Sequence, residues 1–121
     1  MLFRSIKKTL INRAISVKLA NYQYNGALYH SIWDRLVCNR FKDALGGRVR
    51  LMLTGSAPIS TESLNFIKVL FCCPILEGYG QTECCAAATL TAIADNVGGS
   101  VGGPVSGAEI KLVDVKELNY L

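Results

Sequence analysis

The chain has 121 residues, half of them hydrophobic, and a formal net charge of +4 at neutral pH. This length allows one domain at most, and the composition favours a packed interior over disorder. No apolar run reaches the roughly 18 residues that a membrane-spanning helix needs. The basic excess lies in residues 1–33, which contain no acidic residue. The charge pattern therefore argues against a nucleic-acid-binding surface across the domain.

The first 47 residues predict a helical segment. In residues 2–20, apolar side chains recur at helical spacing while the basic ones lie largely on other faces: Phe3, Ile6, Leu10, Ala14 and Val17. A second helix is predicted from Ser31, as the N-cap with Asp34 three residues on, to the glycines at 46–47. Because the N-terminal segment is basic and amphipathic, a membrane-surface helix or a mitochondrial presequence is an alternative interpretation.

Residues 48–121 predict a βαβ core. The stretch 48–55 and the stretch "CPILEG" are typical of strands buried on both faces, and a helix capped by Ser60 or Thr61 lies between them. Another helix is predicted from Thr82, followed by a glycine-rich loop (95–107) and a strand (108–115). This order predicts the α/β class with parallel βαβ units.

The five cysteines predict no metal site. They include two adjacent pairs, but there is no C-x-x-C spacing and His30 is the only histidine. Zinc sites use cysteine and histidine at short spacings, so we expect reduced thiols that act as small hydrophobic side chains in an intracellular protein. Neither His30 nor any cysteine is expected to be a covalent nucleophile. The cysteines are Cys38, Cys72, Cys73, Cys84 and Cys85.

Two unusual turns, "TGSAP" and "EGYGQTE", follow the two predicted parallel strands, so both should open on the same edge of the sheet. In the second turn, Gly78 and Gly80 allow a close ligand approach, and Tyr79 offers a flat ring for stacking a base. Thr82, at the expected helix start, would face a phosphate, and Glu83 beside it would need Mg²⁺ as a bridge. The alternative is an ordinary strand-to-helix turn with helix capping. The dinucleotide pattern G-x-G-x-x-G fails because Glu83 stands at its third glycine.

Four segments, "GGRVRLMLTGSAPIS", "EGYGQTECCAAATLT", "VGGPVSG" and "IKLVDV", occur in the order and at the spacing of a known family. With them, the chain resembles long-chain fatty acyl-CoA synthetases of the adenylate-forming superfamily over nearly all of 31–121, and more loosely over 1–30. The resemblance implies a fragment, residues 1–121, of one AMP-binding domain, the large N-terminal domain of such enzymes. It also implies activation of a fatty acid by ATP to acyl-adenylate, then transfer to coenzyme A. Since other family segments are absent, we expect the isolated chain to be inactive.

The resemblance also implies the roles of individual residues. Thr82 would contact phosphate and Glu83 would bind Mg²⁺, and both would be catalytic. The residues that bind the nucleotide and acyl-adenylate would be Gly55, Ser56, Ala57, Pro58, Gly78, Tyr79, Gly80, Gln81 and Thr82. The small residues at 84–88 and 102–104 would lie near the acyl chain, or else serve tight packing.

The implied partners are a long-chain fatty acid, ATP and coenzyme A. Peripheral association with the endoplasmic reticulum, the mitochondrial outer membrane or the peroxisome is implied for the full-length protein. A non-catalytic nucleotide-binding remnant is the other alternative.

Overall fold

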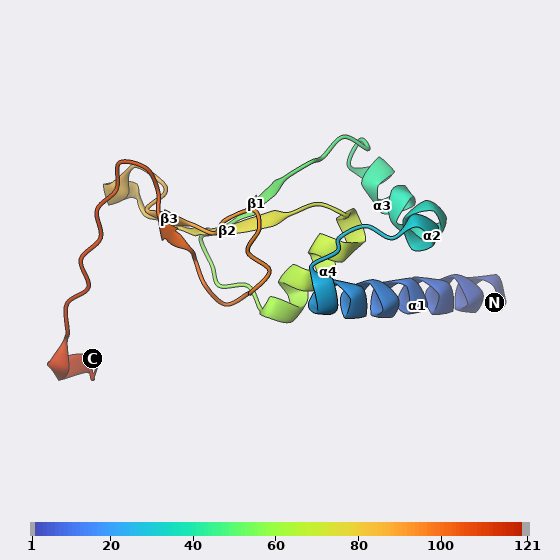
Figure 1. Ribbon diagram of the computed structural model, residues 1–121, viewed down its shortest axis with the longest axis horizontal. Coiled ribbons are helices and arrows are strands. Elements are labelled where there is room, and N and C mark those ends of the chain that lie inside the picture. The colour runs from blue at the N-terminus through green and yellow to red at the C-terminus, as the bar shows by residue number, and fades with distance from the viewer. Residues whose placement is uncertain (1, 120–121) are drawn as a thin grey trace.

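The computed structural model describes the backbone of residues 2–119 and the side chains of residues 6–119. Its helices gather at one end of an elongated molecule, and the sheet extends from them (Figure 1). The helical elements are α1 (Leu2–Asn25), α2 (Ser31–Trp33), a π-helical turn (Asp34–Cys38), α3 (Asn39–Ala44) and α4 (Thr61–Phe71). None of the helices among these described residues is long and apolar enough to cross a bilayer.

The face that helix α1 buries overlaps the predicted apolar stripe only in part, at Ala14. Ala14, Lys18 and Tyr22 are at most 3% exposed, whereas Ile6 and Leu10 remain 52% and 47% exposed. The reason is that α4 lies beside the C-terminal part of α1 (Figure 1), so burial is decided there. Phe3 lies outside the described side chains.

The second predicted helix is present as one continuous helical stretch, but its N-cap is His30 and not Ser31. The backbone N–H of Trp33 donates to His30 Nδ1 at 3.4 Å, and the N–H of His30 donates to Asp34 Oδ2 at 2.8 Å. At the other end, Gly46 and Gly47 have φ values of +83° and +70°, a region that glycine enters without steric cost. The two glycines therefore end the helix as predicted.

Helix α4 begins as the sequence predicts. Ser60 is its N-cap, and Ser60 Oγ accepts a hydrogen bond of 3.2 Å from the backbone N–H of Ser63. This bond satisfies one of the N–H groups that the first turn of a helix leaves without a partner.

We expect Ser60→Ala to lower the free energy of unfolding by about 1 kcal/mol, the usual cost of removing a serine cap. Urea unfolding of the two proteins measures this difference. Ser31→Ala is the matched control, because Ser31 is exposed and does not cap its helix. Equal losses from the two substitutions would contradict the assignment of the caps.

The sheet contains four short strands in the order β1 (Met52–Thr54), β2 (Ile75–Tyr79), β3 (Thr89–Leu90) and β4 (Gly103–Pro104). Strands β1 and β2 are parallel and α4 connects them, so the predicted βαβ unit is confirmed. The register pairs Leu53 with Leu76 and Thr54 with Glu77. Strands β3 and β4 add antiparallel pairs, which makes the sheet mixed.

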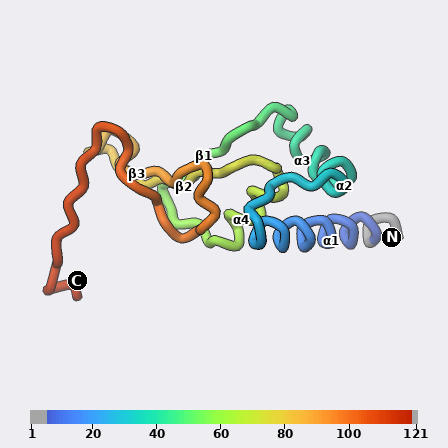
Figure 2. The backbone as a smooth tube through the Cα atoms, in the orientation of Figure 1, coloured from blue at the N-terminus to red at the C-terminus, as the bar shows by residue number. Residues whose placement is uncertain are grey.

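Three details of the predicted core are wrong. Only one 3₁₀ turn, Thr82–Cys84, forms in place of the helix from Thr82, because left-handed residues at 85 and 86 send the chain back into β3. No strand forms over residues 108–114, where the chain leads away from the sheet without a neighbouring strand to pair with (Figure 2). Strand β1 is not buried on both faces, since Leu53 is 69% exposed and no described element covers it.

Candidate functional site

A cavity of about 430 Å³ lies at the edge of the sheet where β1 and β2 end. Three segments line it: Ser56–Ile59 of the first turn, Glu77–Gly80 of the second, and Gly99 with Val101 of the glycine-rich loop. This volume is within the range of small-molecule sites. The two turns that the sequence predicted to open on one edge of the sheet therefore share one cavity.

Parallel pairing brings the two turns together. The last pair in the β1–β2 register joins Thr54 to Glu77, so Gly55 follows directly beside Gly78. A Cβ atom at Gly55 would lie 3.0 Å from the carbonyl oxygen of Gly78, closer than ordinary packing allows. A glycine at position 55 therefore allows the two turns to approach this closely.

Gly80 allows the chain to fold back on itself beyond β2. A Cβ atom at this position would lie 1.5 Å from the carbonyl oxygen of Ala86. The reversal is closed by the N–H of Ala88, which donates to the Tyr79 carbonyl at 2.9 Å. Tyr79 lines the cavity and remains 51% exposed, so its side chain is accessible to a ligand and is not buried in the interior.

The other half of the motif lies outside the cavity lining. Gln81, Thr82 and Glu83 are exposed, with Thr82 and Glu83 in the single 3₁₀ turn. Such a short turn lacks the aligned peptide dipoles of a long helix, so the predicted helix N-terminus is wrong, and the contact of Thr82 with phosphate stays a prediction. The hydroxyl of Thr82 and the carboxylate of Glu83 are nevertheless adjacent, exposed oxygen donors of the kind that Mg²⁺ binds.

Glu77 is a further candidate ligand, which the sequence pattern did not indicate. This residue lines the cavity and is only 7% exposed, and its Oε2 atom is buried without a hydrogen-bond partner among the described residues. Its backbone is tied to Thr91, whose Oγ1 accepts from the Glu77 N–H at 2.9 Å. A buried acceptor without a partner is costly, and a ligand that donates a hydrogen bond would satisfy it. Its position in an otherwise apolar strand was the available signal.

Of the small residues at 102–104, Gly102 is the one that is closely packed in this structure. Gly102 has a φ of +78°, and a Cβ there would lie 2.1 Å from the Leu90 carbonyl oxygen. Gly103 and Pro104 form β4 and pair with β3. None of these three residues lines the cavity at the ends of β1 and β2.

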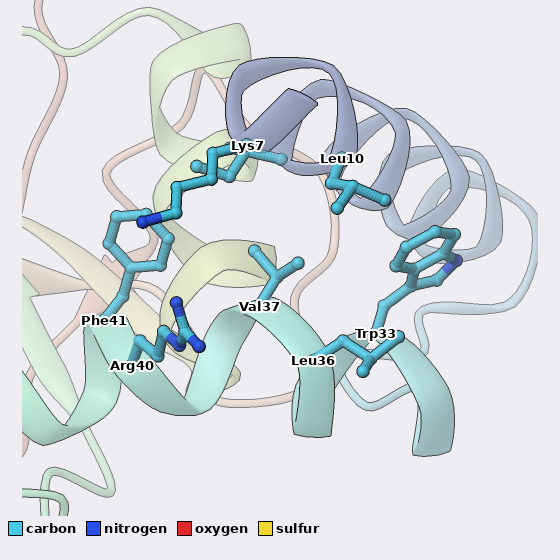
Figure 3. A pocket seen from close by; sticks show the side chains of 8 residues that line it. Lys7, Leu10, Trp33, Leu36, Val37, Arg40 and Phe41 are labelled. Carbon is cyan, nitrogen blue, oxygen red and sulfur yellow. The ribbon is translucent and has the colours of Figure 1, made fainter. Parts of the chain in front are cut away.

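A second, mostly apolar cavity of about 390 Å³ lies between α1 and the helical stretch 33–41 (Figure 3). Trp33 and Leu36 face Leu10 across it, and Lys7 and Arg40 add cationic groups. No residue that the sequence predicted for the site lines this cavity. The helices that supply its lining lie away from the ends of β1 and β2 (Figure 1).

A family described as AMP-binding enzyme matches residues 19–121. The chain is 47% identical over 116 residues to long-chain-fatty-acid–CoA ligase 5 of Rattus norvegicus and 44% identical over 117 residues to long-chain-fatty-acid–CoA ligase 1 of Homo sapiens. It is 45% identical over 115 residues to long chain acyl-CoA synthetase 6, peroxisomal, of Arabidopsis thaliana. These matches cover 95–97% of this chain but only 16–17% of the relatives. No solved structure matches the chain.

Proposed function

Because the chain belongs to the AMP-binding enzyme family, we propose that it carries the nucleotide-binding edge of a long-chain fatty acid–CoA ligase. Such a ligase joins a fatty acid to ATP, giving acyl-adenylate and pyrophosphate, and then transfers the acyl group to coenzyme A. The chain spans about 17% of the length of the relatives. For this chain, we therefore propose only that it binds the adenylate. The nucleotide-binding motifs lie in residues 48–121, and residues 1–47 form the helical segment of the same domain.

One observation carries the proposal: the turns after β1 and β2 meet in a single cavity of about 430 Å³. Tyr79, half exposed at its edge, offers a face on which the adenine base can stack. The buried carboxylate of Glu77 can accept a hydrogen bond from the exocyclic amine of adenine. Ser56–Pro58, across the cavity, would then border the ester of the acyl-adenylate.

The contribution of these residues to the reaction is positional. Holding the fatty carboxylate in line with the α-phosphorus makes the attack effectively unimolecular, which lowers its entropic cost. The oxygen donors of Thr82 and Glu83 fit Mg²⁺, which when bound offsets the negative charge of the phosphates. Gln81, next to them, completes the proposed nucleotide contacts.

The remaining partners follow from the relatives. Two of them are named as ligases of long-chain fatty acids with coenzyme A, and a third is named peroxisomal. We propose the same substrates for the longer protein, on the surface of an intracellular membrane such as the peroxisome, the endoplasmic reticulum or the mitochondrial outer membrane. Helix α1 does not act as a free presequence in this proposal, because Ala14 and Tyr22 are buried in the fold.

The role of Glu83 can be tested by calorimetric titration of the full chain with AMP and with ATP, each with and without Mg²⁺. We expect Glu83→Gln to weaken binding of ATP with Mg²⁺ about tenfold, which corresponds to about 1.4 kcal/mol. Binding of AMP without the metal should not change, because Glu83 does not line the cavity.

Glu117→Gln is the matched control, since Glu117 is an exposed carboxylate outside the cavity lining. A magnesium effect of equal size in the Glu83→Gln and wild-type chains would contradict the role of Glu83. Failure of the wild-type chain to bind either nucleotide would overturn the assignment of the cavity. Pyrophosphate exchange by the longer protein separates a ligase from a non-catalytic nucleotide-binding remnant.

A further inference from the structure

Four polar groups meet in the core at a distance from the proposed nucleotide cavity. The ammonium of Lys18, on α1, is 1% exposed and pairs with the carboxylate of Asp34. It also donates to Cys72 Sγ at 3.0 Å and to Cys38 Sγ at 3.5 Å. The cluster thus joins α1, the π-helical turn and the end of α4, three elements that are far apart in the sequence.

The two thiols of this cluster are close neighbours in chemically different surroundings. A carboxylate oxygen of Asp34 and the Sγ atoms of Cys38 and Cys72 all lie within 4.8 Å of one another. The hydrogen bond from Cys38 and the one from Lys18 lower the pKa of the Cys72 thiol to about 7, although burial opposes this effect. The hydrogen bond to Cys72, together with burial, raises the pKa of Cys38. Cys72 is therefore the more readily ionised thiol of the pair, and Cys38 is the one that stays protonated.

Cys72 is only 2% exposed, and it contacts open space at a cavity. The residue lines a cavity of about 600 Å³ between α3 and the segment that leads into β1. The charged side chains around the cavity are cationic: Lys42, Arg48 and Arg50. Apart from Cys38, the charged groups that act on the Cys72 sulfur are the Lys18 ammonium, which favours the thiolate, and the Asp34 carboxylate, which opposes it.

We propose that Cys72 and Cys38 form a peroxide-sensitive modification site that closes to a disulfide. The Cys72 thiolate attacks one oxygen of hydrogen peroxide, the O–O bond breaks, hydroxide leaves, and Cys72 becomes a sulfenic acid. Cys38 then attacks the Cys72 sulfur, an S–S bond forms, and the sulfenic oxygen leaves as water with the proton of Cys38. Two thiols are oxidised by two electrons in total, and one peroxide is reduced to two waters.

The expected rate advantage is modest and can be measured. At pH 7 a thiol with a pKa of about 7 is about half ionised, roughly 50-fold more than a thiol at the ordinary value of 9.0. The intrinsic nucleophilicity of a thiolate falls with its pKa, which offsets about eightfold of this gain. Cys72 should therefore react roughly sixfold faster than an unperturbed cysteine.

The backbone offers a clean way to remove the reactive thiol. Cys72 has a φ of +52°, the left-handed conformation that glycine commonly occupies after a helix. Cys72→Gly removes the sulfur and relieves this strain, so the variant should fold. It retains Cys73, a buried neighbour whose pKa is raised by burial and by Cys72.

The test uses the full chain with Cys73→Ser, Cys84→Ser and Cys85→Ser, so that Cys38 and Cys72 are the cysteines that remain. After hydrogen peroxide treatment at pH 7 and alkylation in denaturant, we expect a monomer that has lost two hydrogen atoms and takes up no alkylating reagent. Trypsin should release the peptide 36–40 joined by a disulfide to the peptide that carries Cys72. Oxidation should slow about sixfold in the same chain unfolded in urea. It should slow by a smaller factor in the Lys18→Met form of this chain, because the hydrogen bond from Cys38 to Cys72 remains.

The matched control retains Cys73 in place of Cys72. It carries Cys72→Gly, Cys84→Ser and Cys85→Ser, so that Cys38 and Cys73 are the cysteines that remain. We expect no intramolecular disulfide in this chain. A disulfide formed equally fast with Cys73 in place of Cys72 would overturn the proposal. So would equal rates for the folded and urea-unfolded pair, a comparison that does not depend on whether the Lys18 variant folds.

Discussion

Gly80→Ala is expected to abolish AMP binding by the chain and to lower its free energy of unfolding by about 1–3 kcal/mol, the usual cost of overpacking. The added methyl would lie 1.5 Å from the Ala86 carbonyl oxygen and 2.9 Å from Ala87 Cα, so the backbone must move. That movement would break the hydrogen bond between Ala88 and the Tyr79 carbonyl and displace Tyr79 from the cavity edge. Calorimetric titration with AMP and urea unfolding measure the two effects.

Gly103→Ala is the matched control for this substitution. Gly103 lies in β4, and a Cβ there would have no heavy atom within 4 Å, so the same change should alter neither binding nor stability. If Gly80→Ala bound AMP as tightly as the wild-type chain, the close packing of Gly80 on Ala86 would not be needed for the site. The proposed adenine platform would then be wrong.

The sequence could predict the βαβ core because its signals are local. Ser60 as a cap, the glycine pair at 46–47 and the apolar run before Glu77 each act on their own segment of the chain. The parallel arrangement then followed, and it brought the two turns to one edge of the sheet. None of these signals depends on a side-chain contact between segments that are distant in the sequence.

The predictions that failed depended on such distant contacts. The helix expected from Thr82 gives way to a reversal in which Gly80 packs on Ala86, and β3 then pairs back onto β2. The spacing of apolar residues also could not show that Lys18 is buried. Its hydrogen-bond partners Asp34 and Cys72 lie 16 and 54 residues further along the chain. The cysteines, expected to act as small hydrophobic side chains, include two that contact this lysine.

Lys18→Met is expected to lower the free energy of unfolding by about 3 kcal/mol. Removing one partner of a buried ion pair typically costs 3–5 kcal/mol, because the other charge stays buried without compensation. The lower end applies here, since the Asp34 side chain is still 16% exposed. Such a loss is a large part of the roughly 5–15 kcal/mol that stabilises a typical domain. Urea unfolding at neutral pH measures it, with the exposed lysine variant Lys8→Met as the control on the same helix.

The dependence of stability on pH identifies the ion pair as the cause. Burial opposes the charge of Asp34, but the hydrogen bond from Lys18 lowers the pKa of this carboxyl below 3.8. Burial likewise opposes the charge of Lys18, but hydrogen bonds to Asp34 and Cys72 raise the pKa of its ammonium above 10.5. The stabilisation should therefore be complete between these two values, fade as the pH falls below 3.8, and fade again as it rises above 10.5.

In the double variant Lys18→Met with Asp34→Asn, both charges are gone, and we expect part of the lost stability to return. Measured between the single variants, the double variant and the wild-type chain, the coupling between the two positions should be favourable and largest near neutral pH. If the two substitutions were simply additive, the loss in Lys18→Met would come from packing of the lysine side chain alone. Lys18 would then not stabilise the charge of Asp34 electrostatically, and we would not expect it to stabilise the thiolate of Cys72 either.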